Sequence, residues 1–353
     1  MATLAIEPPQ ENKAKKLPIY EASTQFRNWR FSFESLAKVR GSMNAVAVAA
    51  IRKKIEADEP GSSSDIPFLT ADEEVLLVKH YITMISRLSG GFKFPEEVEA
   101  TGITYLKRFY LKNTVMDWHP KNIMLTALFL ATKTSNAPLS LEGYTRLIPK
   151  TAPSDVLDNE FLVAQSLSFE FSVWHAHRAL WGIWLDVQTL PDSTVKLSPD
   201  IYNSALSHIR ASRLTDAEFV YTPSQIALAA FSLAAPEVAA RWLESKNSAA
   251  HTISPNVIEE IKTLIQTQGH PTNVEAVREV DRRLRLCKNP EKVPGSKAYL
   301  AKKAAEEKKA EEKRLKKAET LQKAMDEGDP FGSEIPKSRV GLVDYEDDDD
   351  DDD

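Results

Sequence analysis

The chain has 353 residues, 42% of them hydrophobic, which is enough for one large core or two ordinary ones without disulfide bonds. A single cysteine, Cys287, excludes an intramolecular disulfide and a Cys-rich zinc site, and only 12 glycines argue against phosphate-binding loops and a β-rich fold. The net charge of −6 comes from nine acidic residues among the last ten. The remaining residues carry a net charge of +3, which is too small to indicate binding to nucleic acid.

The beginning of the chain does not have the pattern of a secretory signal peptide. It lacks an apolar segment behind basic residues, which argues against a signal peptide, and no later apolar run reaches membrane-spanning length. Together with the single cysteine, these features predict a cytoplasmic or nuclear protein that does not enter a membrane. Residues 1–19 are polar and contain prolines, and we expect them to be disordered.

Residues 20–57 predict a helical arm with an interruption near Gly41. Aromatic residues are unusually dense in its first part, which contains Phe26, Trp29 and Phe31. Rings of this size must be covered, either by the body of the same protein or by another chain. The three residues are therefore candidates for an additional interface.

Residues 66–171 carry the start signals of a five-helix bundle. The first helix begins with Thr70 and Glu73 at the spacing of a capping box, and we expect it to end at Gly90. The later helices are expected to begin near Pro95, Pro120, Leu141 and Ser154. The last of them is expected to continue to Leu167 as one helix, with Leu157 and Phe161 among its apolar positions.

An apolar helix is expected at the centre of this bundle. Residues 123–133 are apolar on nearly every side, and about eleven residues are too few to span a bilayer. The same pattern returns at residues 226–235, after an N-cap at Thr222. Residues 172–270 therefore predict a second bundle with the same order of helices, although one helix before Ser254 cannot be placed well.

Three further segments follow the second bundle. Residues 273–288 predict an amphipathic helix outside both repeats. Residues 291–328 consist mostly of Ala, Lys and Glu, and opposite charges at i, i+4 favour an exposed helix, for which a solvated helix without a role is the simplest interpretation. The tail, residues 329–353, ends in seven consecutive aspartates and is expected to be disordered.

The sequence contains no motif of a known catalytic site. Phosphate-binding glycine loops, the kinase Asp-Phe-Gly motif and the Gly-x-Ser-x-Gly elbow are all missing. His175 and His177 are the closest His pair, but no carboxylate or cysteine is near them in sequence, which favours packing at a domain junction over a metal site. We therefore expect a binding protein without catalytic residues, metal or cofactor.

Two segments resemble a known family. Residues 103–133 (ITYLKRFYLKNTVMDWHPKNIMLTALFLATK) resemble the first cyclin box of the H-type branch of the cyclin family, and residues 214–230 (LTDAEFVYTPSQIALAA) resemble the second. The motif FRNWRFS in the arm resembles the N-terminal helix outside the boxes of that branch. The resemblance covers about residues 20–290 and implies an all-α fold of tandem five-helix cyclin boxes with extra N- and C-terminal helices.

The resemblance also implies a function. H-type cyclins are regulatory subunits that activate the catalytic subunit of the CDK-activating kinase. The partners implied are this cyclin-dependent kinase, a RING-type assembly factor and the core of the general transcription factor TFIIH. The complex phosphorylates activation loops of cell-cycle kinases and the C-terminal domain of RNA polymerase II, which implies a nuclear protein that is not itself an enzyme.

Two residues match positions at which cyclins contact their kinase. Lys133 ends the family's Ala-x-Lys motif, and Glu160 matches the glutamate of the fifth helix. Both are expected to form charge-assisted hydrogen bonds with backbone groups around the kinase helix that cyclins reposition. Arg108 matches a family arginine with a structural role. The chain departs from the family at Thr134, where most cyclins have an acidic residue, and it lacks the substrate-docking motif of mitotic cyclins.

Other interpretations remain open from the sequence. A transcriptional cyclin of the C or T type is the nearest alternative to the H type. A TFIIB-like factor shares the helical repeat and binds DNA, but the single cysteine and the nearly neutral body argue against its zinc ribbon and basic surface. An inert helical scaffold would bind no kinase at all.

Overall fold

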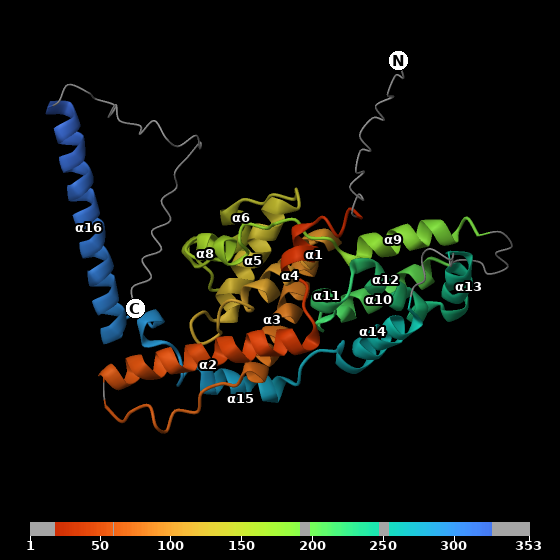
Figure 1. Ribbon diagram of the computed structural model, residues 1–353, viewed down its shortest axis with the longest axis horizontal. Helices are drawn as coiled ribbons and strands as arrows, with labels where there is room; N and C mark the ends of the chain where they lie inside the picture. Colours follow the sequence, from red (N-terminus) through yellow and green to blue (C-terminus); the bar gives the residue numbers. More distant parts are fainter. Residues whose placement is uncertain (1–17, 59, 191–197, 247–253, 327–353) are drawn as a thin grey trace, which may run out of the picture. The chain divides into compact units, whose positions relative to one another are not determined.

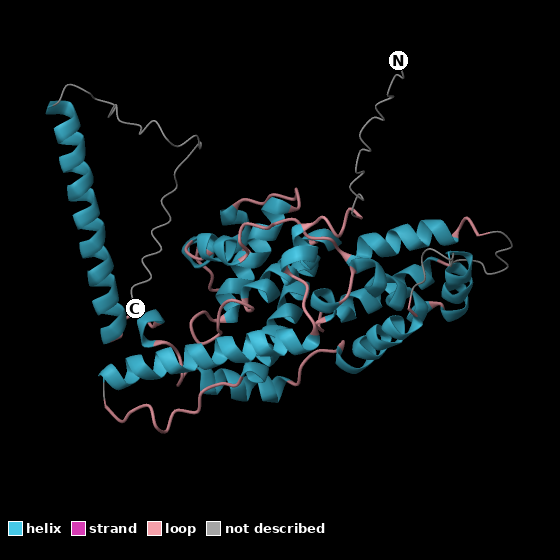
Figure 2. Ribbon diagram, viewed as in Figure 1, coloured by secondary structure: helices cyan, strands magenta, loops and turns pink. Residues whose placement is uncertain are grey.

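The computed structural model describes residues 18–58, 60–190, 198–246 and 254–326, and these residues contain helices and no strands (Figures 1 and 2). Residues up to Lys292 belong to one compact unit, and residues from Val293 onward belong to a second unit. The all-α class predicted from the sequence is confirmed. The disorder expected for residues 1–19 and 329–353 concerns segments outside the described residues, except at Pro18 and Ile19, where the described chain begins with a turn in which the Ala22 N–H donates to the Pro18 carbonyl.

The arm consists of a short helix and a long one. Helix α1 spans Thr24–Asn28 and α2 spans Phe33–Asp58, with the break at Trp29 to Ser32. The predicted interruption near Gly41 is wrong, because α2 continues through this residue. An exposed glycine inside a helix costs only about 1 kcal/mol, which the flanking turns of a long helix tolerate.

The first bundle comprises α3 (Ala71–Phe92), α4 (Glu96–Phe109), α5 (Pro120–Thr134), α6 (Leu141–Arg146), α7 (Pro153–Leu157) and α8 (Glu160–Ser166). The capping box at Thr70 and Glu73 forms as expected, while α3 continues two residues beyond Gly90 before Lys93 turns into the left-handed region. The fifth predicted helix is in fact two helices, which are separated by a turn at Asp158 and Asn159.

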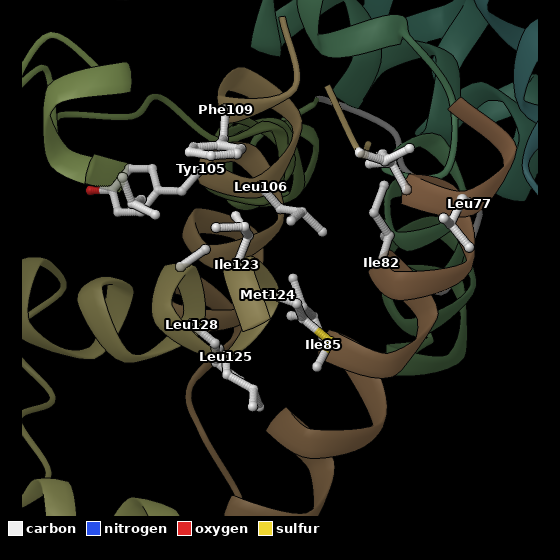
Figure 3. Close-up of a cluster of buried hydrophobic side chains, with 14 of the residues drawn as sticks. Leu77, Ile82, Ile85, Tyr105, Leu106, Phe109, Ile123, Met124, Leu125 and Leu128 are labelled. Carbon is white, nitrogen blue, oxygen red and sulfur yellow. The ribbon is translucent and has the colours of Figure 1, made fainter. Parts of the chain in front are cut away.

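Helix α5 is the centre of this bundle, as the apolar run predicts. All of its residues from Ile123 to Thr132 are buried, and it packs against α3, α4, α7 and α8. Figure 3 shows its side chains among those of α3 and α4. Helix α4 approaches α5 closely at Gly102, where a Cβ atom would lie 3.3 Å from the backbone Cα of Leu128. The missing side chain therefore lets α4 and α5 come together.

The second bundle repeats this plan. It comprises α9 (Ala176–Val187), α10 (Pro199–Ser212), the short α11 (Ala217–Val220), α12 (Pro223–Ala234), α13 (Pro236–Lys246) and α14 (Pro255–Gln268). Helix α12 is its buried centre and begins with a capping box formed by Thr222 and Gln225. The helix that the sequence could not place is α13.

Two C-terminal helices complete the described chain. Helix α15 (Val274–Leu284) packs against α3, and its buried residues Val277, Val280 and Leu284 join the core of the first bundle. A 3-10 turn follows at Pro290–Lys292.

The second unit contains α16 (Lys297–Asp326), which is an exposed, charged helix as its sequence predicts. The Nζ atom of Lys302 lies 3.9 Å from a carboxylate oxygen of Glu306. Across the described ranges, none of the helices is long and apolar enough to cross a membrane.

Candidate functional site

Lys133 and Glu160 lie together at one rim of the first bundle. The ammonium nitrogen of Lys133 lies 2.6 Å from a carboxylate oxygen of Glu160, and both side chains are partly exposed. The same ammonium group lies 4.7 Å from the centroid of the Phe129 ring. Two charged groups separated by 26 residues in sequence are thus held side by side where another protein can reach them.

The buried parts of α5 and α8 position this pair. Lys133 follows directly after the buried residues of α5, so the packing of that helix fixes where its last turn emerges. Glu160 is the first residue of α8, whose residues Val163 and Ala164 are buried against the bundle. Glu160 follows the turn at Asp158 and Asn159 that separates α7 from α8, and its carboxylate lies next to Lys133.

Large apolar side chains of the first bundle are exposed, and one of them, Phe161, follows Glu160 directly in sequence. Phe161 is 70% exposed and Phe169 is 55% exposed, with their ring centroids 6.1 Å apart. Leu147 and Leu157 are also exposed. The expectation that Phe161 and Leu157 lie on the apolar face of a single helix is wrong, because both side chains are exposed. Exposed aromatic rings beside charged groups are typical of a protein-binding surface.

The exposed position of Phe161 can be predicted from the sequence. Val163 and Leu167 are four residues apart and define the buried face of this segment. Phe161 precedes Val163 by two positions, which places it on the opposite side of a helix. Phe169 follows Ser168, and both have positive φ values, of 56° and 54°, which side chains other than glycine adopt rarely. No local pattern predicted this turn.

The aromatic residues of the arm pack against the protein's own body. Trp29 is 4% exposed and lies in a cluster with Leu36, Leu111 and Phe219. Its indole N–H donates a hydrogen bond of 2.5 Å to the carboxylate of Glu170. Of the two coverings that the sequence left open, Trp29 is therefore covered by the same chain and offers little surface to another protein.

Phe26 and Phe31 retain more exposed surface than Trp29. Phe31 is half-buried, packs on Phe219 at a centroid distance of 6.1 Å and donates its backbone N–H to the Phe219 carbonyl. Phe26 is half-buried and meets the edge of Tyr20. The arm thus binds both bundles, since Glu170 ends the first and Phe219 lies in α11 of the second.

Arg108 contacts Trp29 of the docked arm. Its guanidinium lies 4.7 Å from the centroid of the Trp29 ring and donates to the backbone carbonyl of Glu170 at 3.3 Å. Burial lowers the pKa of Arg108 to about 10, so it remains charged at neutral pH. The residue is almost fully buried, which fits the structural role that the resemblance implies.

His175 and His177 meet a carboxylate that the sequence did not place near them. Glu97 in the first turn of α4 accepts from Arg178 and lies 3.1 Å from the Nε2 atom of His177. His175 is buried and pairs with the hydroxyl of Thr101. Burial lowers the pKa of both histidines. These contacts join the two bundles, and no group of three or more side chains suited to a metal ion occurs in the described ranges.

Comparisons with known proteins agree with this architecture. Residues 69–172 match the family described as "Cyclin, N-terminal domain", and residues 175–268 match the "Cyclin C-terminal domain". The chain is 32% identical to cyclin mcs2 of Schizosaccharomyces pombe over 319 residues, which are 88% of this chain and 98% of the relative. It is also 32% identical to a putative cyclin-H of Dictyostelium discoideum, over 61% of this chain and 75% of the relative.

Solved structures also resemble this one. A chain of the CAK complex from Chaetomium thermophilum, bound to ATP-gamma-S, is 30% identical and superposes with a TM-score of 0.70 over 77% of this chain and 90% of that chain. A chain of the yeast TFIIK complex (Kin28/Ccl1/Tfb3) is 31% identical, with a TM-score of 0.59 over 70% of this chain and 100% of that chain. The predicted likeness to the H-type branch is confirmed by these matches.

Proposed function

The chain belongs to the cyclin family, and from this premise we propose that it is the regulatory subunit that binds and activates the kinase of a CDK-activating kinase complex. The observation that carries the proposal is the likeness to a chain of the CAK complex, at a TM-score of 0.70 and 30% identity. The substrates proposed are activation loops of cyclin-dependent kinases and the C-terminal domain of RNA polymerase II.

The proposed kinase-binding site consists of Lys133, Glu160, Phe161 and Phe169. An ammonium group has three donors and a carboxylate has several acceptor positions, so their mutual contact leaves capacity for a partner. The two charged groups bind backbone atoms around the kinase helix, and the exposed rings bury apolar surface beside them. This contact holds the kinase helix inward, where its glutamate pairs with the ATP-site lysine.

The proposal also covers partners and location. A RING-type assembly factor and the TFIIH core are the further partners, and the nucleus is the compartment in which this complex works. The chain itself contributes no catalytic residue and binds neither DNA nor a membrane in this role. Support comes from the similar structures, one of which is a complex of the three proteins Kin28, Ccl1 and Tfb3.

Reconstitution with the purified kinase subunit tests the proposal. We expect a stable binary complex and a strong increase in phosphorylation of a peptide with RNA polymerase II C-terminal repeats. Absence of binding, or binding without stimulation, would contradict the proposal. Activation of only a Mediator-associated kinase would instead favour the C-type alternative, and binding to DNA alone would favour the TFIIB-like one.

A further inference from the structure

The last turn of α5 carries Lys133, the proposed kinase contact, and Thr134, and Ser135 caps the helix. Lys133 and Thr134 are exposed. Helix ends fray, because their last carbonyl groups lack partners within the helix and few buried contacts hold them. A contact that holds this turn in place therefore also determines where the ammonium group of Lys133 lies.

Tyr105 of α4 binds the end of α5 through its hydroxyl group (Figure 3). Its Oη atom lies 2.9 Å from the hydroxyl oxygen of Thr134 and donates to the backbone carbonyl of Phe171 at 2.7 Å. A phenol has one proton, so its oxygen accepts from Thr134, to which the Leu130 carbonyl lies less close, at 3.2 Å. The side chain thus connects α5 to residues 167–175, the linker between α8 and α9.

A second series of hydrogen bonds begins at the same helix end. The Ser135 hydroxyl donates to the hydroxyl oxygen of Thr101 at 3.3 Å, which in turn lies 2.9 Å from the Nε2 atom of His175. Burial lowers the pKa of His175 well below its ordinary value, so the ring is neutral and Nε2 can accept the Thr101 proton. Both series therefore run from the end of α5 to the linker.

Tyr105 is too deeply buried to contact a kinase itself. Its side chain is 0% exposed, and its ring packs edge-on against Phe171 at a centroid distance of 6.1 Å. Burial raises the pKa of Tyr105 to about 12, so the phenol keeps its proton at neutral pH. The ring accounts for the packing, and the hydroxyl group supplies the bond to Thr134. Any effect of this hydroxyl group on kinase binding must pass through the residues that it contacts.

We propose that Tyr105 is a positioning residue for kinase binding: its hydroxyl group fixes the last turn of α5 to the linker and thereby orients Lys133. This inference rests on the proposed function, in which Lys133 contacts the kinase. Without the hydroxyl group the last turn frays, and Lys133 adopts more orientations. The kinase must then order this turn when it binds, which lowers its affinity.

The substitution Tyr105→Phe tests the proposal because it removes the hydroxyl group and keeps the ring. Tyr144→Phe is the matched control. Tyr144 is also 0% exposed, and its hydroxyl donates to α5 at 2.9 Å, but to the carbonyl of Leu125 in the first half of the helix. Both substitutions should lower the melting temperature, since each removes a buried hydrogen bond. Only Tyr105→Phe should loosen the end of α5.

Amide hydrogen exchange of the free chain measures the loosening directly. We expect Tyr105→Phe to accelerate exchange at residues 130–135 about threefold or more, beyond any uniform change along the chain. Tyr144→Phe should leave these amides unchanged. Thr134→Val removes the same contact from the exposed side and should accelerate the same amides. Unchanged exchange at the helix end in both Tyr105→Phe and Thr134→Val overturns the inference.

Binding to the purified kinase is measured in a double-mutant cycle with Lys133→Ala. We expect Tyr105→Phe to weaken binding about fivefold and Tyr144→Phe to leave it unchanged. In the Lys133→Ala background, Tyr105→Phe should weaken binding by less than about twofold, because the group that it positions is gone. Equal losses for the two tyrosine substitutions overturn the inference, as does a fivefold loss that persists without Lys133.

The unaltered chain and Lys133→Ala separate this inference from the proposed function. If the unaltered chain binds and activates the kinase but Lys133→Ala retains full affinity, the function stands and the inference fails. If the unaltered chain binds no kinase, the proposed function and the inference fail together.

Discussion

The ammonium group of Lys133 and the carboxylate of Glu160 form an ion pair of 2.6 Å at the rim of the first bundle. The family resemblance predicted both residues as separate contacts to a kinase, and the structure adds that they contact each other. An exposed pair of this kind stabilises a fold by about 0–1 kcal/mol. Its effect on binding can therefore be measured with little change in stability.

Glu160→Lys is expected to weaken binding to the kinase at least about tenfold, because it removes an acceptor and places two like charges together. The melting temperature should stay nearly constant. Glu142→Lys, at an exposed position of α6, is the control for the change in net charge. Full affinity of folded Glu160→Lys would remove Glu160 from the site. Titration calorimetry and thermal unfolding provide both measurements.

The double variant Lys133→Glu, Glu160→Lys separates the intramolecular pair from the kinase contact. It restores opposite charges at the two positions, so thermal stability should return to that of the unaltered chain. The kinase still meets a donor where it requires an acceptor, and we expect binding to stay weak. Restored binding would indicate that the pair acts only within the chain.

Trp29→Ala is expected to destabilise the protein by about 3 kcal/mol, because it empties a buried site and leaves Arg108 without the ring above it. Denaturant unfolding measures this loss, and faster proteolysis within the arm should accompany it. Phe33→Ala, on the same arm but with an exposed ring, should change stability little. Equal effects of the two substitutions would refute the docking role of Trp29.

Acidification is expected to destabilise the fold between about pH 7 and 5. Burial, with a contribution from His177, lowers the pKa of His175 well below its ordinary value of 6.5. The unfolded chain therefore takes up a proton near pH 6.5 while the folded chain does not, and stability falls as pH decreases. The slope for His175 is at most about 1.4 kcal/mol per pH unit.

The variant His175→Gln should reduce this pH dependence, since glutamine can bond to Thr101 but does not titrate in this range. Stability measured by denaturant at several pH values gives the slope. An unchanged slope would show that other groups, such as His119 or His177, account for it.

Gly102→Val is expected to destabilise the first bundle by about 1–3 kcal/mol, because even the Cβ atom would come within 3.3 Å of the backbone of Leu128. Gly91→Val, at an exposed helical position with nothing within 4 Å, is the matched control. Thermal unfolding of both variants should show a clear loss for the first only. Similar values would indicate that helix propensity alone is responsible.

Local signals in the sequence predicted most of the helices and both buried centres. The capping boxes at Thr70 and Thr222 and the apolar runs of α5 and α12 act within a few residues, so their consequences can be read along the chain. The candidate site is different, because Lys133 and Glu160 were identified through the family resemblance and not through any local pattern.

Tertiary structure alone decided which distant residues meet. Trp29 contacts Glu170, and Glu97 contacts His177, because the packing of the two bundles and the arm brings these residues together. Helix signals act over one or two turns, whereas these contacts depend on the orientation of whole helices, which is set by the shape of the surfaces they bury.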